Sequence, residues 1–400
     1  MENERNSKGW GLFVLGLVVG VLVALIITSI IFKQNIQLTE GSLLDARVAK
    51  KVEALEGLIQ ERFYLSEMTS EELEEGIYRG MLEALDDPYS EYYTAEELEE
   101  LMQQSAGIYY GIGAYVSLDQ KTSLPKINRV IADTPAEEAD LRPDDLIYQV
   151  DGEATFGLSL SEAVALIKGP EGTNVKLTII RKGESDNLEV VVSRRKVNSP
   201  SVEYEMLDEG IAYIQITEFN DLTADQFADA YAVARGSDMK GLILDLRSNP
   251  GGSLNSVVEI ARMILPEGLI VYTEDKAGKR SEYRCDGKRE LQVPLVVLID
   301  GNTASAAEIL SGAIQDYKLG TLVGTTTFGK GIVQQIIGME DGSAIKITIS
   351  SYFTPKGRNI HGTGIEPDVE CEFDGETYYS TEDRYDNQIE KAKEVLRGLM

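Results

Sequence analysis

The sequence has few of the side chains that bind metal ions or nucleic acids. Among 400 residues there is one histidine, His361, and there are two cysteines, Cys285 and Cys371, whose separation fits no metal-ligand spacing. We therefore expect no metal site, and whether the two cysteines pair stays open. With 38 basic against 67 acidic side chains, the net charge of −29 repels phosphate groups. Nucleic acid is accordingly not an expected partner.

One long stretch carries no charge: residues 10–32, WGLFVLGLVVGVLVALIITSIIF. As a helix it spans about 34 Å at ~1.5 Å per residue, enough to cross a bilayer. A cleavable signal peptide is the alternative, but the run is longer than a usual h-region and no A-x-A-like site follows. Arg5 and Lys8 precede it, which favours an inside N-terminus. We expect a single-pass cell membrane protein with a cytoplasmic tail at 1–9, a transmembrane anchor at 10–32 and the rest outside the cytoplasm.

Residues 43–104 form the next predicted region, which is helical. Apolar side chains such as Val52, Leu55 and Ile59 recur at helical spacing. The stretch LDDPYSEYYTAEELEEL interrupts the pattern with a proline-containing turn, and Thr94 with Glu97 then predicts a capping box. The apolar stripe is either packed within the chain or the seam of a homodimer.

From residue 105 to 196 the pattern changes to short β-type runs broken by Gly, Pro and Asp, with one helix at LSLSEAVALIKG. A small barrel-like sheet with a helix beside it leaves a groove that suits a peptide added as a strand, with its carboxylate held by backbone N–H groups. The segments YYGIGAYV, DTPAEEADLRPDDLIYQVDG and IKGPEGT resemble, in this order, a PDZ domain. Asp144 stands where such domains usually have glycine, and aspartate tolerates the left-handed conformation that the turn needs. The residues expected to bind the peptide are Gly111, Ile112, Gly113, Val164, Ile167 and Lys168.

Residues 200–374 predict an α/β core, and residues 375–400 a C-terminal helix. The continuous apolar strands GLILDLR and LVVLID, each followed by a helix, indicate a parallel sheet covered on both faces. Ligands of such sheets lie at the carboxyl ends of the strands. NPGG at 249–252 and NTAS at 302–305 both occupy that position.

Ser305 opens a helix at one of these strand ends. Unpaired N–H groups there can stabilise an oxyanion, although the same serine can simply cap the helix. A nucleophilic hydroxyl also needs a base. His361 is one candidate, in a glycine-rich polar loop; Lys330 is another, because apolar surroundings lower the pKa of an ammonium group.

The segments DLRSNPGG, NTASAAEIL, FGKGIVQ and SYFTPKGRNIHGTGIEPD resemble, in order and spacing, the carboxyl-terminal processing (tail-specific) serine proteases. LDDPYSEYYT and the PDZ-like segment match the same family. The resemblance implies Ser305 as nucleophile, Lys330 as general base 25 positions later, and Gln334 as the residue that orients the lysine. Asp316 falls where some members carry a supporting acid. We expect the oxyanion donors to be the N–H groups of Ala306 and Gly251, since a residue without Cβ lets the backbone approach the substrate.

The sequence thus predicts an α+β multidomain protein. Its expected function is that of a membrane-anchored endopeptidase with a Ser–Lys dyad, which needs no cofactor. The expected substrates are extracytoplasmic proteins whose apolar C-terminal tails bind the PDZ domain. A catalytically inert PDZ scaffold is the alternative.

Overall fold

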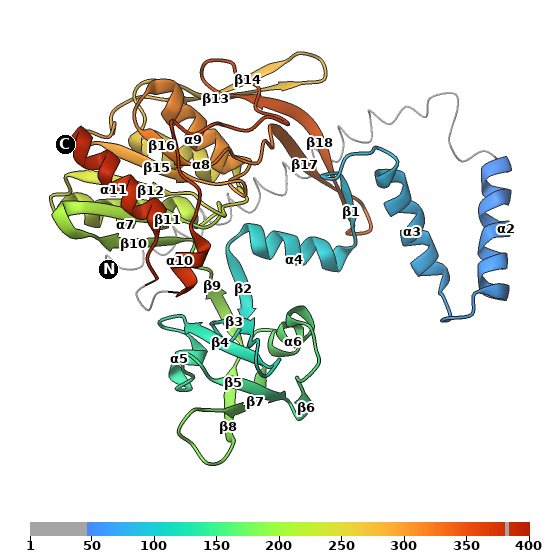
Figure 1. Ribbon diagram of the computed structural model, residues 1–400. Coiled ribbons are helices and arrows are strands. Elements are labelled where there is room, and N and C mark those ends of the chain that lie inside the picture. The colour runs from blue at the N-terminus through green and yellow to red at the C-terminus, as the bar shows by residue number, and fades with distance from the viewer. Residues whose placement is uncertain (1–45, 381–383) are drawn as a thin grey trace, which may run out of the picture. The chain divides into compact units, whose positions relative to one another are not determined.

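The computed structural model describes residues 46–380 and 384–400, a mixed α+β chain (Figure 1). Two units are distinguished, the first ending at Gly80 and the second running from Met81 to Met400. No helix within these described residues is long and apolar enough to cross a membrane. The predicted tail at 1–9 and the predicted anchor at 10–32 lie outside them.

The first unit consists of helix α2 (Ala46–Arg62) and most of helix α3 (Ser70–Glu83). As the apolar spacing predicts, both segments are helical, but neither helix has a buried residue. The second unit begins with the short strand β1 (Glu91–Tyr93) and helix α4 (Ala95–Ser105). The predicted capping box at the start of α4 is confirmed, since Thr94 and Glu97 satisfy each other's backbone N–H groups.

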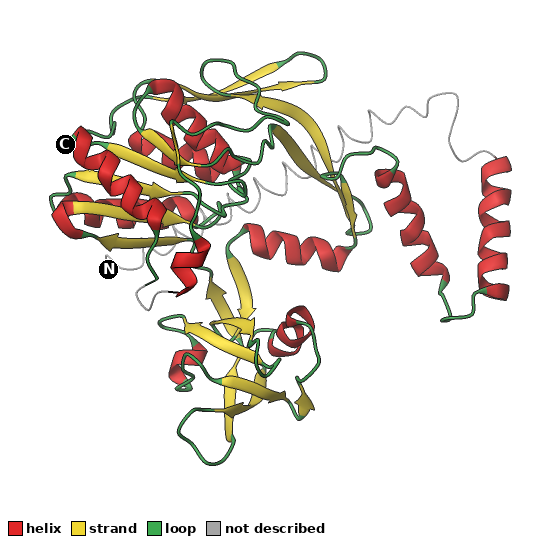
Figure 2. Ribbon diagram, viewed as in Figure 1, coloured by secondary structure: helices red, strands yellow, loops and turns green. Residues whose placement is uncertain are grey.

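A small antiparallel sheet with two short helices follows, as the β-type runs predict (Figure 2). Its strand order is β3-β4-β5-β7-β8, with β6 beside β5, and its core holds buried Ile127, Ile147 and Leu177. The turn at Asp144 has φ of 71°, so aspartate does adopt the left-handed conformation there. The elements are β3 (Ala114–Leu118), β4 (Pro125–Val130), α5 (Pro135–Glu138), β5 (Leu146–Val150), β6 (Glu153–Ala154), α6 (Leu160–Ile167), β7 (Asn174–Ile180) and β8 (Leu188–Ser193). The flanking strands β2 (Ile108–Gly111) and β9 (Arg195–Asn198) pair antiparallel in a separate two-stranded sheet.

The α/β part is built on a sheet of strand order β10-β11-β12-β15-β16-β19. β10 pairs antiparallel with β11, and the remaining pairs are parallel. β12 and β15 are buried along their whole length, because helices cover both faces of the sheet. The elements are β10 (Val202–Met206), β11 (Ile211–Ile216), α7 (Thr223–Gly236), β12 (Gly241–Asp245), α8 (Leu254–Ile264), β15 (Leu295–Ile299), α9 (Ala306–Tyr317), β16 (Thr321–Gly324), β19 (Val369–Glu370), α10 (Gly375–Ser380) and α11 (Asn387–Leu399).

Alternate residues of these strands enter two different cores, as the period of a strand requires. One face packs on α7, α8 and α9, for example through Leu244 and Val297. The other packs on the C-terminal helix α11, where Ala392 and Leu396 lie against Ile243 and Leu298. The predicted parallel sheet with two covered faces is therefore confirmed.

A second sheet has the order β1-β18-β13-β14, and β17 also pairs with β18. Its further strands are β13 (Gly268–Asp275), β14 (Arg280–Cys285), β17 (Ile332–Gly338) and β18 (Ala344–Phe353). Through β1, this sheet brings residues 91–93 against residues 344–346 of β18. A segment from the region predicted as helical thus lies within the second sheet.

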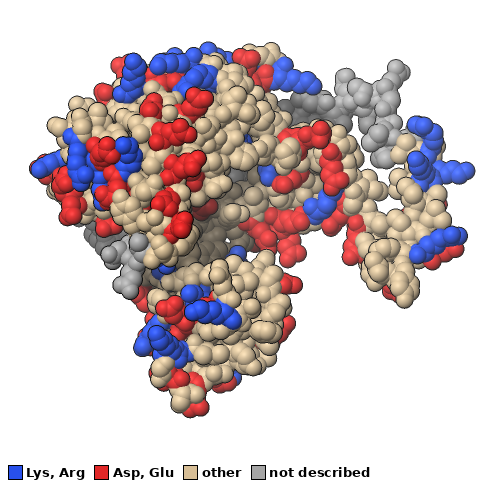
Figure 3. Space-filling view, in the orientation of Figure 1, with Lys and Arg blue, Asp and Glu red and all other residues tan. Residues whose placement is uncertain are grey.

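On the face drawn in Figure 3, acidic and basic side chains are interspersed over the α/β part. This distribution agrees with a chain that has 67 acidic and 38 basic residues.

Candidate active site

Ser305 lies between the carboxyl end of β15 and the first residue of α9. Its φ of 54° and ψ of −114° place it in a backbone region that residues with a Cβ rarely adopt. Such strain is found mostly at functional sites, because the surrounding structure has to maintain it. The conformation therefore separates Ser305 from an ordinary N-cap residue, whose backbone is extended.

Gly251 lies directly against this serine. A Cβ built on Gly251 would lie 2.7 Å from Ser305 Cβ and 2.9 Å from Ala306 N, and the residue has φ of 98°. Only glycine fits this position without displacing the serine. Its N–H donates to Asn249 Oδ1 at 2.8 Å, so an oxyanion at Gly251 would have to replace that acceptor. Ala306 is the first residue of α9, where a helix has no internal partner for its N–H.

Lys330 is half-buried in the loop between β16 and β17. Burial lowers the pKa of its ammonium group from the ordinary lysine value, and the positive charge of Lys346 lowers it further. The charges of Asp87 and Glu91 act in the opposite direction. Lys330 Nζ lies 4.4 Å from the centroid of the Tyr89 ring, within the range of a cation–π contact.

Glu308, which was not among the residues predicted for the site, connects Ser305 with Lys330. Its fully buried carboxylate accepts from Ser305 N at 2.8 Å and from Lys330 N at 2.9 Å. It also accepts from Thr327 Oγ1 and Gly329 N. Four donors satisfy the buried charge, which fixes the two backbone segments beside each other. The Ser-x-x-Glu spacing of residues 305–308 is the signal that could have identified it.

Tyr352 makes a second connection between the same two residues. Its hydroxyl lies 3.0 Å from Ser305 O and 2.6 Å from Lys330 O, and its side chain is 1% exposed. Burial raises the pKa of this phenol well above its ordinary value, with a contribution from Glu308. No local sequence pattern marks this residue, because its partners lie 47 and 22 positions away.

Gln334 is on β17, four residues beyond Lys330. Its amide was predicted to orient the lysine, but in the structure it donates to a different side chain. Gln334 Nε2 donates to Thr348 Oγ1 at 3.1 Å, and Thr348 Oγ1 donates to Asp87 Oδ2 at 2.7 Å. Asp87 and Tyr89 both belong to the LDDPYS turn. The structure therefore adds this turn to the candidate site, whereas the sequence analysis interpreted it only as a family match and an interruption between helices.

Of the two other sequence candidates, Asp316 lies apart from this arrangement and His361 lies beside the lysine loop. Asp316 is near the far end of α9, about 16 Å from Ser305 along the helix axis. There it accepts from Lys356 N and forms an ion pair of 2.6 Å with Arg358, contacts that hold the loop after β18. The structure does not bring Asp316 to Ser305. His361 is an exposed residue of the loop before β19, and its backbone lies against the lysine loop, because a Cβ built on Gly331 would lie 2.6 Å from His361 N.

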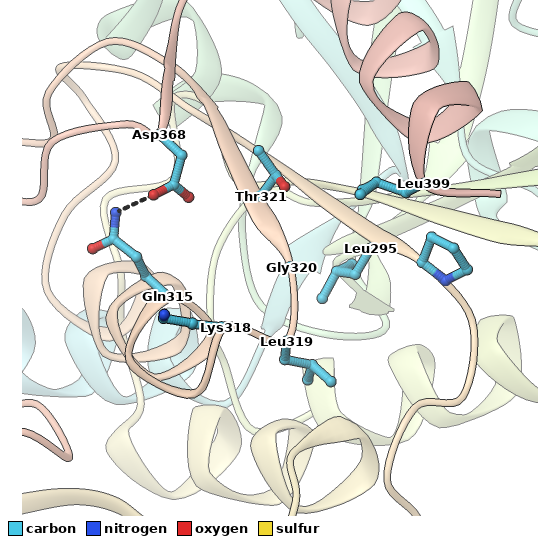
Figure 4. Close-up of a pocket in the computed structure, with 9 residues that line it drawn as sticks. Leu295, Gln315, Lys318, Leu319, Gly320, Thr321, Asp368 and Leu399 are labelled. Atoms are coloured by element: carbon cyan, nitrogen blue, oxygen red, sulfur yellow. Dashed lines mark hydrogen bonds between the residues drawn. The ribbon is translucent and has the colours of Figure 1, made fainter.

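A pocket of about 450 Å³ lies at the amino ends of the parallel strands, opposite to the strand ends that carry Ser305 (Figure 4). It is lined by Leu295 and Thr321, the first residues of β15 and β16, and by Gln315, which donates to Asp368. Ser305 follows the carboxyl end of β15. This pocket is therefore separate from the candidate active site.

The predicted peptide-binding residues of the small sheet surround the edge strand β3. Gly111 is the last residue of β2, and Ile112 and Gly113 connect it to β3, with φ of 88° at Gly113. Ile112 is 3% exposed and packs in the core, and its carbonyl accepts from Ala136 N at 2.7 Å. Lys168 ends α6, and its Cγ would lie 4.0 Å from a Cβ built on Gly111. The stem of the Lys168 side chain thus lies beside Gly111.

Comparison with known proteins is consistent with this geometry. The family model described as Peptidase family S41 matches residues 210–371. The "Carboxyl-terminal-processing protease" of Synechocystis sp. is 34% identical over 345 residues, which cover 85% of this chain and 81% of that protein. The "Carboxy-terminal processing protease CtpA" of Bacillus subtilis (strain 168) is 35% identical over 346 residues, which cover 84% and 73%. The chain belongs to peptidase family S41.

Further parts of this S41 peptidase match other families. Residues 126–181 match the PDZ domain, and residues 30–97 match the model described as Activating protease CtpB N-terminal domain. A crystal structure of a putative S41 protease from Bacteroides fragilis NCTC 9343, 17% identical, covers 80% of this chain and 90% of its own with a TM-score of 0.56, which shows a shared fold. The resemblance to carboxyl-terminal processing proteases with a PDZ domain is confirmed, and serine-type peptidase activity is what the family implies.

Proposed function

We propose that this chain is a membrane-anchored serine endopeptidase in which Ser305 is the nucleophile and neutral Lys330 the general base. The observation that carries the proposal is the Glu308 carboxylate, which binds the backbone N–H groups of both residues. It brings together a strained serine and a half-buried lysine that are 25 positions apart in the sequence.

In the proposed reaction, Ser305 Oγ bonds to the peptide carbonyl carbon while its proton passes to Lys330 Nζ. The carbonyl electron pair moves to the oxygen, where the N–H groups of Ala306 and Gly251 stabilise the negative charge. When the intermediate collapses, the C–N bond breaks and Lys330 returns the proton to the leaving amine. Water, deprotonated by the same lysine, then attacks the ester carbonyl; the bond between the acyl carbon and Ser305 Oγ breaks, and the lysine returns the proton to Ser305 Oγ.

Two contacts of the described structure change before this reaction. Lys330 Nζ leaves the Tyr89 ring for the Ser305 hydroxyl, and Gln334 exchanges Thr348 for the lysine that it orients. The proposal therefore requires both side chains to rotate away from their present partners. Asp316 has no part in the proposal, because its contacts to Lys356 and Arg358 are structural.

The PDZ domain is proposed to bind the C-terminal tail of the substrate. The edge of β3 that no described strand pairs with can accept a strand beside α6, where half-buried Val164 offers an apolar side chain. Ile167, predicted to line the same groove, is 4% exposed and belongs to the core. Lys168 and the backbone at Gly111–Gly113 would hold the terminal carboxylate. This chemistry favours proteins and peptides with apolar C-termini.

Membrane anchoring and extracytoplasmic action are proposed from the uncharged run at residues 10–32. The mass of the mature protein's N-terminus tests this part, since a cleaved leader would remove the run. Homodimer formation through the apolar stripe of the N-terminal helices stays a prediction.

The testing experiment gives the full chain an unfolded protein with an apolar C-terminus and follows its cleavage. We expect Ser305→Ala and Lys330→Ala to lower the cleavage rate by roughly 100-fold or more, because a general base contributes about 10²–10⁴. The same substrate ending in aspartates is the control for the tail. Full cleavage by either variant would refute the proposed dyad, and absence of cleavage by the unchanged chain would favour the inert scaffold.

A further inference from the structure

Tyr352 occupies a position on β18 from which its hydroxyl reaches both halves of the candidate site. The side chain is 1% exposed, and its oxygen lies within hydrogen-bond distance of the carbonyls of Ser305 and Lys330, at 3.0 and 2.6 Å. A phenol has one proton to donate, so the two carbonyls share it. The hydroxyl thus bridges the residue before α9 and the loop before β17.

The two carbonyls differ in what else binds them. Ser305 O also accepts from Glu308 N at 2.9 Å and Ile309 N at 3.0 Å, as the first carbonyl of a helix does. Tyr352 supplies the shorter bond to Lys330 O. Loss of the hydroxyl would therefore remove more of the restraint on Lys330 than on Ser305. The loop that carries Lys330 could then move relative to helix α9.

Tyr352 and Glu308 connect the same pair of residues through different backbone groups. Glu308 accepts from the N–H groups of Ser305 and Lys330, and Tyr352 donates to their carbonyls. Together they restrain the rotation of both peptide segments, which determines where the hydroxyl and the amine point. A misplacement of about 1 Å between reacting groups can cost ~10²-fold in rate.

We propose that Tyr352 is a positioning residue, whose hydroxyl sets the approach of Lys330 Nζ to Ser305 Oγ by holding their two carbonyls together. The inference rests on the proposed roles of Ser305 and Lys330. The hydroxyl itself touches no substrate atom in this scheme. The high phenol pKa, caused by burial, keeps the donor proton in place over the pH range in which the lysine titrates.

Tyr352→Phe is the test, because it removes the hydroxyl and leaves the ring. Tyr317→Phe is a matched control, since the Tyr317 hydroxyl also donates to a backbone carbonyl, that of Leu269 at 2.9 Å. Cleavage of the unfolded substrate is measured with both full-length variants, together with their thermal unfolding. We expect kcat of Tyr352→Phe to fall roughly 10- to 100-fold with KM within about twofold, and kcat of Tyr317→Phe to stay near that of the unchanged chain.

The outcomes separate this inference from the proposed function. If Ser305→Ala and Lys330→Ala are inactive while Tyr352→Phe cleaves like Tyr317→Phe, the positioning role is refuted and the dyad stands. If the dyad variants cleave at the full rate, the proposed function fails first. A Tyr352→Phe chain that does not fold, beside a folded Tyr317→Phe chain, would show that the hydroxyl serves the fold and would also overturn the proposal.

Discussion

At the scale of single residues, the candidate site depends on Gly251, whose backbone lies directly against residues 304–306. A methyl group there would meet Ala304 O and Ser305 Cβ, both at 2.7 Å. Real Cβ atoms do not come this close to a backbone oxygen, so the serine loop would have to move. Because the loop also carries the Ala306 N–H, its movement would disturb both the nucleophile and the oxyanion donors.

We predict that Gly251→Ala lowers kcat roughly 100-fold or more, as loss of one oxyanion donor does. Gly183→Ala is the control, since Gly183 has the same φ of 98° but a Cβ built on it would have no atom within 4 Å. Both variants carry similar backbone strain of about 1–2 kcal/mol, so both are expected to unfold at a lower temperature. Only Gly251→Ala should lose cleavage, and equal kcat values for the two variants would contradict the account.

Single residues also show how far sequence reasoning reached. Ser305, Lys330 and Gly251 belong to short motifs, and the structure places them at adjacent loops. Tyr352 lies in a strand, where a buried aromatic residue usually belongs to the core. Nothing in a single sequence indicates that its hydroxyl contacts the carbonyl of Ser305. Side-chain contacts over long sequence separations depend on the tertiary fold, which local patterns do not encode.

At the scale of elements, strand β1 shapes the surroundings of Lys330. β1 pairs with β18, which places Glu91 opposite Lys346, and their side chains form an ion pair of 2.7 Å. The turn before β1 supplies the Tyr89 ring that lies against Lys330 Nζ. A segment of three residues, Glu91–Tyr93, could not be identified as a strand from the sequence, because its pairing partner is about 250 positions away.

This arrangement predicts a shift in the pH dependence of the reaction. The positive charge of Lys346 lowers the pKa of Lys330, so Lys346→Gln should raise that pKa, and the released Glu91 charge should act in the same direction. A base that must be neutral works above its pKa, so the midpoint of kcat/KM against pH should move to higher pH. Lys288→Gln, which removes an exposed lysine paired with Asp286, is the control. A midpoint that stays or falls in Lys346→Gln would count against this role of β18.

At the scale of the whole molecule, the order of regions along the chain was accessible from composition and periodicity. The parallel sheet was predicted from two apolar strands, and its second covered face was confirmed by helix α11. The boundaries predicted at 105–196, 200–374 and 375–400 stay predictions, since family matches cover only parts of those ranges. Tail binding by the PDZ domain stays a prediction, since the family match at residues 126–181 shows the domain and not its ligand.

The central claim is that the amine of Lys330, in its uncharged form, activates Ser305. The most direct measurement is the rate at which a fluorophosphonate labels Ser305 as a function of pH, in the full chain and in Lys330→Ala. The account predicts a rate that rises with pH through a midpoint below the ordinary lysine value of 10.5 and that collapses in the variant. An equal labelling rate in Lys330→Ala, with the same pH profile, would contradict it.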